Sequence, residues 1–296
     1  MPFYTMNELL ALDPAKDWCV GHFNVHNYTT LGGVVKAAEE MKAPAILALG
    51  AQAYKHIGME NIMALCFSVM EQSSGRFALH IDHARDLGLI RKALRLGASS
   101  VMFDGSSLSF EENIRMTKEM VQMAHDYGAS AEGEVGEVPM PGGSRADIMY
   151  TDPDQAAEFA ERTGVDFLAV SLGSIHGMKT SSMDLDQDLL RRLSSIGVPL
   201  VLHGASGVTE DAIRTATRNG LRKININTAL KGAAVKRIRE RLAVEPDCDL
   251  LALLEDGREG VRALAAHYME LFGSAGRVKD CTVTGNSLPE HLLQGE

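Results

Sequence analysis

Short apolar runs that end in polar residues recur along the chain and predict buried β-strands. The clearest is Phe77-Ala78-Leu79-His80-Ile81-Asp82-His83, in which the apolar run ends in an Asp-His pair. Seven other runs have a similar character. The predicted strands cover residues 19–24, 45–49, 77–81, 99–104, 129–135, 166–172, 199–204 and 223–227.

Helical patterns follow most of these strands. They cover residues 28–42, 57–74, 86–96, 109–127, 153–163, 184–196, 209–219 and 229–242. Eight repeats of strand and helix predict an α/β fold, a closed (β/α)8 TIM barrel rather than an open sheet. A further helical segment, 250–272, lies beyond the eighth unit, and we expect it to pack across the barrel end or against a partner subunit. Residues 1–296 are predicted to form a single domain with a polar tail from about 278 to 296.

Composition narrows the class of partner. The net charge of −10 argues against nucleic acid, whose binding depends on basic patches, and no apolar run has the length of about 20 residues that a membrane span needs. The first residues do not resemble a signal peptide, and the four cysteines are too widely spaced for a disulfide framework or a CxxC site. These features predict a cytoplasmic protein that binds neither nucleic acid nor membrane.

Three histidines follow predicted strands and have the character of metal ligands. His83, His176 and His203 come after the third, sixth and seventh strands, whose ends converge at one mouth of a barrel. Three imidazoles with an open fourth position describe a catalytic Zn²⁺ site, although each histidine alone could be a satisfied polar residue near the core. Asp82, beside His83, suits a general acid/base; the alternatives are that it only orients His83 or caps the next helix.

Other carboxylates lie at or near strand ends at the same mouth, and one more histidine lies inside a strand. Asp104 and Glu134 could supply a second metal position, or they could be ordinary capping and salt-bridge residues. Glu132 shares a strand face with Glu134, and its role stays open at this point. His80 lies inside its strand, on the face of Asp82, which favours a buried supporting role.

Two segments could bind a phosphate group through their backbone. Gly204-Ala205-Ser206 follows the seventh strand, and Asn225-Ile226-Asn227-Thr228 ends the eighth and opens a helix. Phosphate sites in barrels are frequently built from these two loops.

At these residues the chain resembles the class II, zinc-dependent fructose-bisphosphate and tagatose-bisphosphate aldolase family. The likeness runs nearly end to end. It is carried by segments that include Gly21-His22-Phe23-Asn24-Val25, Leu79-His80-Ile81-Asp82-His83, Glu132-Gly133-Glu134-Val135-Gly136, Gly173-Ser174-Ile175-His176-Gly177, Leu202-His203-Gly204-Ala205-Ser206-Gly207 and Lys223-Ile224-Asn225-Ile226-Asn227-Thr228.

The resemblance implies a role for each matching position. His83, His176 and His203 would hold Zn²⁺, with a monovalent cation as a further candidate ion, and Asp82 would be the proton donor. Asp104 and Glu134 match carboxylates of an alternative metal position. The positions that match the dihydroxyacetone phosphate site are Gly177, Lys179, Gly204, Ala205, Ser206, Asn225, Ile226, Asn227 and Thr228. The resemblance also implies a homodimer or homotetramer.

The chain departs from the family pattern at positions that bear on which substrate it accepts. The long Gly/Pro-rich loop 136–149, expected to be a lid, has Ser144 and Arg145 after its Gly-Gly pair where relatives have acidic residues. Proton transfer or recognition could therefore fall to Glu137, Arg145 or Asp147. Gly50 stands where relatives often have Ser or Thr.

The sequence thus predicts a zinc-dependent aldolase. It would reversibly cleave a ketose 1-phosphate or 1,6-bisphosphate to dihydroxyacetone phosphate and an aldehyde. The alternatives are a barrel metal-hydrolase and a non-catalytic barrel that serves as the partner subunit of an aldolase. A complete set of three histidines and Asp82 favours the aldolase over the partner subunit.

Overall fold

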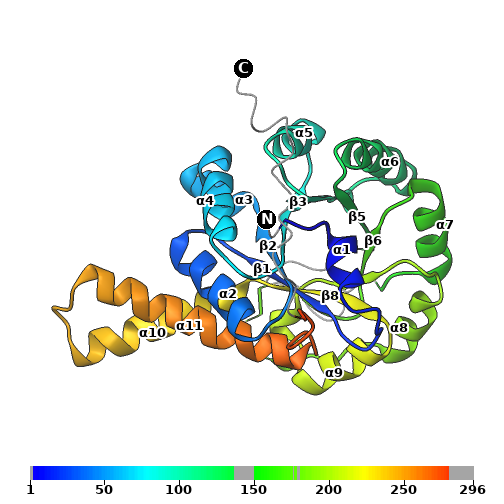
Figure 1. The fold of residues 1–296 in the computed structure, drawn as a ribbon. Coiled ribbons are helices and arrows are strands. Elements are labelled where there is room, and N and C mark those ends of the chain that lie inside the picture. The colour runs from blue at the N-terminus through cyan, green and yellow to red at the C-terminus, as the bar shows by residue number, and fades with distance from the viewer. Residues whose placement is uncertain (1–2, 137–149, 176, 179–180, 280–296) are drawn as a thin grey trace.

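The chain folds into a closed barrel of parallel strands surrounded by helices (Figure 1). The computed structural model describes residues 3–136, 150–175, 177, 178 and 181–279. Neighbouring strands pair in sequence order, and β1 pairs in parallel with β8 to close the barrel. The strands are β1 (Val20–Asn24), β2 (Ala45–Leu49), β3 (Phe77–Ala84), β4 (Ser100–Phe103), β5 (Ser130–Val135), β6 (Phe167–Val170), β7 (Leu200–Leu202) and β8 (Leu221–Ile226). The predicted (β/α)8 barrel is confirmed.

Helices cover the outside of the strands. They are α2 (Tyr28–Glu40), α3 (Ala51–Ile57), α4 (Met59–Glu71), α5 (Leu87–Arg95), α6 (Phe110–Asp126), α7 (Pro153–Thr163), α8 (Gln187–Ser194), α9 (Glu210–Arg218), α10 (Thr228–Val244) and α11 (Leu250–Leu271). The helix predicted at 57–74 is in fact preceded by a separate short helix. Gly58, with φ of 84°, ends α3 and begins α4, a conformation that glycine adopts readily.

A helix that the sequence did not predict, α1 (Met6–Ala11), lies against the barrel interior. Its Met6 and Leu9 are fully buried and pack with Trp18 and with apolar residues early in the strands, such as Val20 and Ala78. A capping box at Thr5 starts the helix. These contacts close the amino-terminal end of the barrel with apolar side chains, so the opposite end is left for chemistry.

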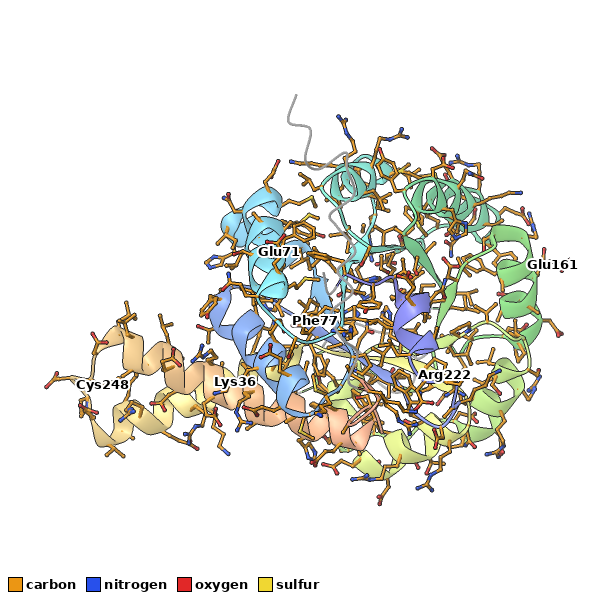
Figure 2. All side chains as sticks on the ribbon, viewed as in Figure 1. Lys36, Glu71, Phe77, Glu161, Arg222 and Cys248 are labelled. Carbon is orange, nitrogen blue, oxygen red and sulfur yellow. The ribbon has the colours of Figure 1, made fainter. Side chains whose placement is uncertain are left out.

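Side chains alternate between the two faces of each strand, and the inward-facing ones change from apolar near the amino-terminal end of the barrel to polar near the carboxyl-terminal end. In β3 the inward face runs from Ala78 through His80 to Asp82, and in β5 it includes Glu132 and Glu134. Side chains fill the space inside and around the barrel, which is therefore a packed core and not a pore (Figure 2).

The last two helices form an arm that projects from the side of the barrel (Figures 1 and 2). α11 packs against α2 and α10 rather than across the barrel end, which corrects one of the two placements expected for this segment. Glycines allow the helices to approach closely: a Cβ on Gly33 would lie 2.7 Å from the Cβ of Val261, and one on Gly260 would lie 2.6 Å from the carbonyl oxygen of Ala233. Within the described residues, no helix is long and apolar enough to cross a membrane.

Candidate active site

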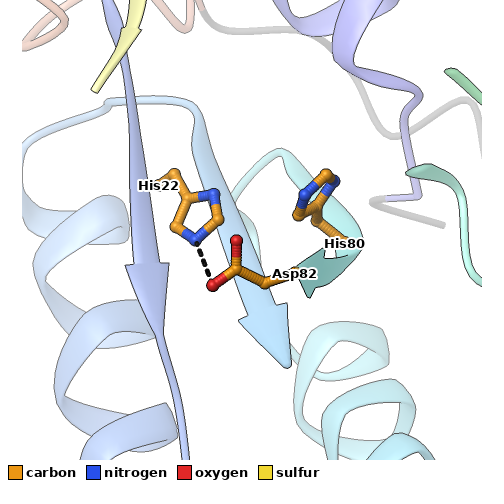
Figure 3. A group of neighbouring side chains, drawn as sticks. All are labelled: His22, His80 and Asp82. Atoms are coloured by element: carbon orange, nitrogen blue, oxygen red, sulfur yellow. Dashed lines mark ion pairs between the residues drawn. The ribbon is translucent and has the colours of Figure 1, made fainter. Parts of the chain in front are cut away.

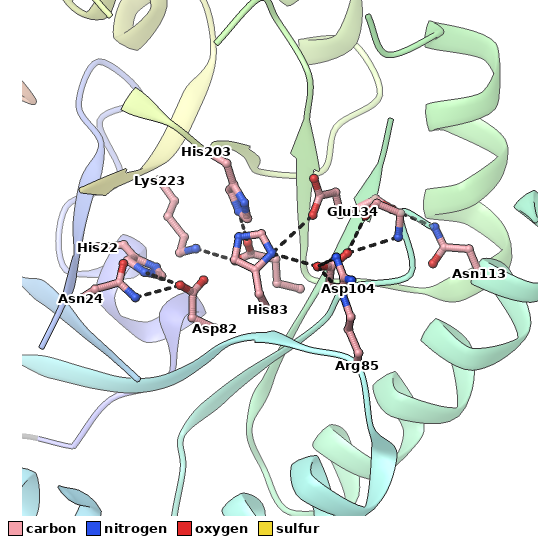
Figure 4. A network of polar contacts seen from close by, with 12 residues as sticks. His22, Asn24, Asp82, His83, Arg85, Asp104, Asn113, Glu134, His203 and Lys223 are labelled. Carbon is pink, nitrogen blue, oxygen red and sulfur yellow. Dashed lines mark hydrogen bonds and ion pairs between the residues drawn. The ribbon is translucent and has the colours of Figure 1, made fainter. Parts of the chain in front are cut away.

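Two of the predicted metal-binding histidines meet at the carboxyl ends of the strands (Figure 4). The rings of His83 and His203 have centroids 4.6 Å apart and stand nearly perpendicular, at 80°. His83 has a φ of 50°, unusual for a residue other than glycine, where the pairing of β3 with β4 is irregular. Together with Glu134, these histidines present ligand atoms that all lie within 4.8 Å of one another.

The buried oxygen Oε2 of Glu134 has no hydrogen-bond partner in the described structure and lies 3.8 Å from Nδ1 of His83. Two imidazoles and a carboxylate oxygen form a donor set that suits a divalent metal such as Zn²⁺. The residues therefore fit the ion that the sequence predicts, and Glu134 belongs to the group.

His203 is oriented by the buried Glu132, which in turn pairs with the buried Lys223. Its Nε2 lies 3.0 Å from Oε1 of Glu132, and Oε2 of Glu132 lies 2.8 Å from Nζ of Lys223. All three side chains are almost completely buried. Burial raises the pKa of Glu132, but Lys223 and the hydrogen bond from His203 lower it by more, well below the usual range. An ionised Glu132 accepts a hydrogen bond from the Nε2–H of His203, which leaves the free lone pair on Nδ1, the nitrogen then suited to bind a metal.

Asp104 lies on the other side of His83. Its Oδ2 accepts hydrogen bonds from Nε and Nη2 of Arg85 and lies 3.2 Å from Nδ1 of His83, while Oδ1 accepts the hydroxyl of Ser106 at 2.6 Å. Burial opposes ionisation, but these partners hold the pKa of Asp104 well below its ordinary value. Asp104 is thus placed to orient His83. The salt bridge that the sequence offered as one interpretation of this residue is formed with Arg85, and its role at a second metal position stays a prediction.

Asp82 stands beside His83 and is fixed by two residues of β1 (Figures 3 and 4). Nδ2 of Asn24 donates to its Oδ2 at 2.8 Å, and Nε2 of His22 lies 3.7 Å from the same oxygen. Burial raises the pKa of Asp82, but His22 and His83 lower it by more, so the carboxylate is ionised near neutral pH. A charged, oriented carboxylate at the mouth of the barrel can accept and return a proton.

A second histidine pair lies deeper, and it also approaches Asp82 (Figure 3). His22 and His80 have ring centroids 5.2 Å apart, and ligand atoms of His22, His80 and Asp82 come within 4.8 Å of one another. Burial, and next the charge of Lys223, lower the pKa of His22 to about 4 and that of His80 well below its usual value. The positive charge of Lys223 also disfavours a divalent metal ion at this pair. In addition, Nδ1 of His80 forms a hydrogen bond with Oγ of Ser100 at 2.7 Å. We therefore interpret this pair as support for Asp82, in line with the supporting role expected for His80.

The two predicted phosphate-binding segments lie side by side. The backbone N–H of Ala229, in the first turn of α10, donates to Oγ of Ser206 at 3.4 Å. Gly204 has a left-handed backbone and leads into the short 3₁₀ helix η2 (Ala205–Gly207). The buried side-chain oxygens of Asn225 and Asn227 have no hydrogen-bond partner in the described structure. The helix start and these orphaned polar atoms are consistent with the predicted site, which also includes Ile226 and Thr228 by sequence.

Several predicted residues fall outside the part of the chain that the structure describes. They are His176, Lys179, Glu137, Arg145 and Asp147, together with the predicted lid beyond Gly136. Gly177 is described, has a φ of 72° and directly precedes Met178 in the loop after β6. A Cβ on Gly207 would lie 2.5 Å from the Cβ of Met178, so the loops after β6 and β7 are in contact.

Lys223, Asn24 and His22 belong to the site although the sequence did not predict them as site residues. Lys223 begins the predicted strand 223–227, and its alternation with Asn225 was the available signal that it faces inward.

The likeness to known proteins agrees with this geometry. Residues 4–277 match the family model described as fructose-bisphosphate aldolase class-II. The chain belongs to this family. Class II aldolases are generally metal-dependent, which is in keeping with the donor group around His83 and His203.

Relatives of this class II aldolase span nearly its whole length. The Escherichia coli (strain K12) protein YdjI is 40% identical over 268 residues, which cover 89% of this chain and 95% of the relative. The sulfofructosephosphate aldolase of Alkalicoccus urumqiensis is 36% identical over 269 residues, 88% of this chain and 93% of the relative.

Solved structures show the same fold. The crystal structure of the YdjI aldolase from Escherichia coli K12 matches with a TM-score of 0.81 and 38% identity, covering 93% of this chain and 98% of that one. A putative fructose-1,6-bisphosphate aldolase from Coccidioides immitis matches with a TM-score of 0.82 and 28% identity, covering 92% and 97%.

We predict that Glu132→Gln weakens metal binding by about 10- to 100-fold, because the amide neither carries the charge that pairs with Lys223 nor fixes the tautomer of His203. Competition with a chelating dye measures the Zn²⁺ affinity, and circular dichroism checks that the variant is folded. Glu161→Gln, at an exposed position on α7, is the matched control. A folded Glu132→Gln variant with unchanged affinity would contradict the role given to Glu132.

Metal binding should release protons near neutral pH. In the metal-free protein, burial lowers the pKa of His83, but Asp82, Asp104 and Glu134 raise it by more, to about 9. Burial raises the pKa of Glu134 to about 8. Below these values both groups carry a proton that a metal must displace, so affinity should rise with pH up to about 9 and then level off.

Calorimetry at pH 7 in two buffers of different ionisation enthalpy counts the protons released. We expect more than one proton per Zn²⁺. Equal heats in the two buffers, together with a pH-independent affinity, would refute this electrostatic description of the site.

Proposed function

We propose that this protein is a Zn²⁺-dependent aldolase that reversibly cleaves a ketose 1-phosphate or 1,6-bisphosphate to dihydroxyacetone phosphate and an aldehyde. The observation that carries the proposal is the position of the Asp82 carboxylate, which accepts a hydrogen bond from Asn24 and lies beside the donor group of His83, His203 and Glu134. A base next to a metal-binding group is the pair that aldol cleavage without a Schiff base requires. The family of this chain and its aldolase relatives support the same class of reaction.

Cleavage breaks the bond between C3 and C4 of the ketose. The C4 hydroxyl loses its proton, its oxygen becomes the carbonyl oxygen of the aldehyde, and the electron pair of the broken bond moves to the dihydroxyacetone phosphate half as an enediolate. The enediolate then takes up a proton at C3 to give dihydroxyacetone phosphate. When bound by His83, His203 and Glu134, with His176 as the further ligand that the sequence predicts, a divalent metal supplies positive charge where the enediolate develops.

Asp82 handles the proton on the C4 oxygen. In cleavage its carboxylate accepts that proton, and in condensation it returns the proton to the aldehyde oxygen. Asn24 fixes Oδ2 through a 2.8 Å hydrogen bond, while the buried Oδ1 makes no hydrogen bond in the described structure. The carboxylate is thus oriented by one oxygen, and the other is available for the substrate.

The phosphate of the dihydroxyacetone phosphate half would bind at the loops after β7 and β8. Ser206 and the first amides of α10 supply donors there, and Asn227, the residue that precedes the helix, makes no capping hydrogen bond through its side chain. Gly177 borders the same region, because it precedes Met178, and Met178 contacts Gly207 in the loop after β7. An anion at this position would neutralise the positive end of the helix dipole.

Cleavage of a panel of ketose 1-phosphates and 1,6-bisphosphates by the Zn²⁺-loaded protein tests this proposal. A coupled assay detects dihydroxyacetone phosphate. We expect turnover of at least one substrate, its loss with a chelator, and a fall of about 10²- to 10⁴-fold in kcat for Asp82→Asn, which keeps the shape of Asp82 without its basicity. A folded, Zn²⁺-loaded protein that cleaves none of the panel, or an Asp82→Asn variant as active as the wild type, would overturn the proposal.

A homodimer or homotetramer remains part of the proposal. The tip of the arm exposes Val244, Leu250 and Leu251, whose exposed fractions of 87%, 65% and 69% are high for large apolar residues. A second copy of the chain would cover such a surface.

Light scattering should give the mass of a dimer or tetramer, and Leu250→Asp with Leu251→Asp should shift it toward the monomer. Lys236→Asp, on the exposed face of α10, changes charge without removing apolar surface and is the control. A monomeric mass of the wild-type protein would refute the prediction.

A further inference from the structure

Arg85, on the segment between β3 and α5, reaches from solvent to the edge of the metal-donor group (Figure 4). Its Nε and Nη2 both donate to one oxygen, Oδ2 of Asp104, at 3.0 and 2.9 Å. The side chain of Arg85 is 65% exposed, whereas that of Asp104 is 5% exposed. A permanent positive charge is therefore paired with a buried carboxylate beside His83, the first residue of the donor group.

A shift in strand pairing brings Arg85 opposite Asp104. The pairing of β3 with β4 shifts by one residue before Ala84, which pairs with Phe103. The backbone N–H of Asp104 donates to the carbonyl oxygen of Ala84 at 2.8 Å. Without the shift, Ala84 itself would stand opposite Asp104, and with it the next residue, Arg85, does. His83, whose φ is 50°, lies within the irregular stretch, so the feature that directs this histidine also directs Arg85.

Hydrogen-bond donors already occupy both oxygens of Asp104. Besides the two bonds from Arg85, Oδ2 lies 3.2 Å from Nδ1 of His83, and Oδ1 accepts the backbone N–H and the hydroxyl of Ser106. A carboxylate has about four lone-pair positions, and these partners use them. Oε2 of Glu134, in contrast, is buried without a hydrogen-bond partner in the described structure. Glu134 thus has an oxygen available to a metal, and Asp104 does not.

The charges around His83 lead to the same distinction. Asp82 precedes this histidine, and carboxylate oxygens of Asp104 and Glu134 lie 3.2 and 3.8 Å from its Nδ1. One divalent ion at the donor group and one guanidinium together carry three positive charges, which balance the three carboxylates. The guanidinium of Arg85 cannot lose its proton, so it repels a further cation at any working pH.

We propose that Arg85 takes the place of a second metal ion at Asp104, so that the active site binds one divalent ion and not two. This inference rests on the proposed Zn²⁺-dependent function and adds the number of ions to it. A second ion at Asp104 would need the lone pairs that Arg85 and Ser106 use, and it would face the charge of the guanidinium. Asp104 then serves to orient His83 rather than to bind metal.

Loading with two metals in sequence tests the inference without an activity assay. The protein first takes up one equivalent of Zn²⁺, measured by competition with a chelating dye, and Mn²⁺ is then added. Mn²⁺ suits a position made of carboxylate oxygens, and electron paramagnetic resonance measures how much of it stays free. Arg85→Met should bind one equivalent of Mn²⁺ at least about tenfold more tightly than the wild type, because the carboxylate of Asp104 loses its two charged hydrogen bonds.

Three further variants separate charge, position and ligand. Arg85→Lys keeps a positive charge and should bind Mn²⁺ nearly as weakly as the wild type. Arg91→Met, at an exposed position on α5, is the matched control and should behave as the wild type. Arg85→Met combined with Asp104→Asn should lose the added affinity, because an amide oxygen is a poorer ligand than a carboxylate. Circular dichroism checks the folding of each variant, and Arg85→Gln replaces Arg85→Met if that variant folds poorly.

Equal Mn²⁺ affinities of the wild type and a folded, Zn²⁺-loaded Arg85→Met variant would overturn the inference and leave the proposed aldolase function standing. So would an added affinity that survives in the double variant, since Asp104 would then not be the ligand. Failure of the wild type to take up the first equivalent of Zn²⁺ would overturn the proposed function and this inference with it.

Discussion

The buried ion pair between Glu132 and Lys223 is the interaction on which the site depends. Two charges with no exposed surface face each other at 2.8 Å inside the barrel, and the second oxygen of Glu132 holds His203. Such a pair gains little net stability, because desolvation offsets the attraction. Removing one partner is costly, however, since an uncompensated charge then stays buried. The pair therefore acts mainly to fix the tautomer and direction of His203, and through them the geometry of the donor group.

Because inward-facing side chains of neighbouring strands lie at the same height in the closed barrel, they form layers across its interior. Apolar side chains, with Met6 and Leu9 of α1, close the amino-terminal end; Glu132, Lys223, His22 and His80 form a buried polar layer; and Asp82 and the His83 group stand at the mouth. The polar layer faces a low-dielectric floor, which strengthens each of its interactions. Asp82 and His203 are thus oriented by buried neighbours, and the proposed substrate would approach them from the mouth of the barrel.

Much of this arrangement could be predicted from the sequence, because the carboxyl ends of parallel strands meet at one place in a barrel. That rule alone predicts that His83, His203, Asp82 and Glu134 lie at the same end of the barrel, as they do. Other features depend on contacts that local patterns do not contain. Helix α1 has only six residues and is held by tertiary packing, and Lys223 resembles an ordinary charged residue until the barrel closes around it. The place of α11 beside α2 likewise depends on glycines that permit close helix packing.

The most direct test of the central claim is the position of the metal in a crystal of the Zn²⁺-loaded protein, located by anomalous diffraction at the zinc edge. We predict a single strong peak at about 2.0–2.1 Å from a ring nitrogen of both His83 and His203, with Glu132 still paired to Lys223 and hydrogen-bonded to His203. A peak at the deeper group of His22, His80 and Asp82 would contradict it, because Asp82 would then be a ligand and could not act as the base.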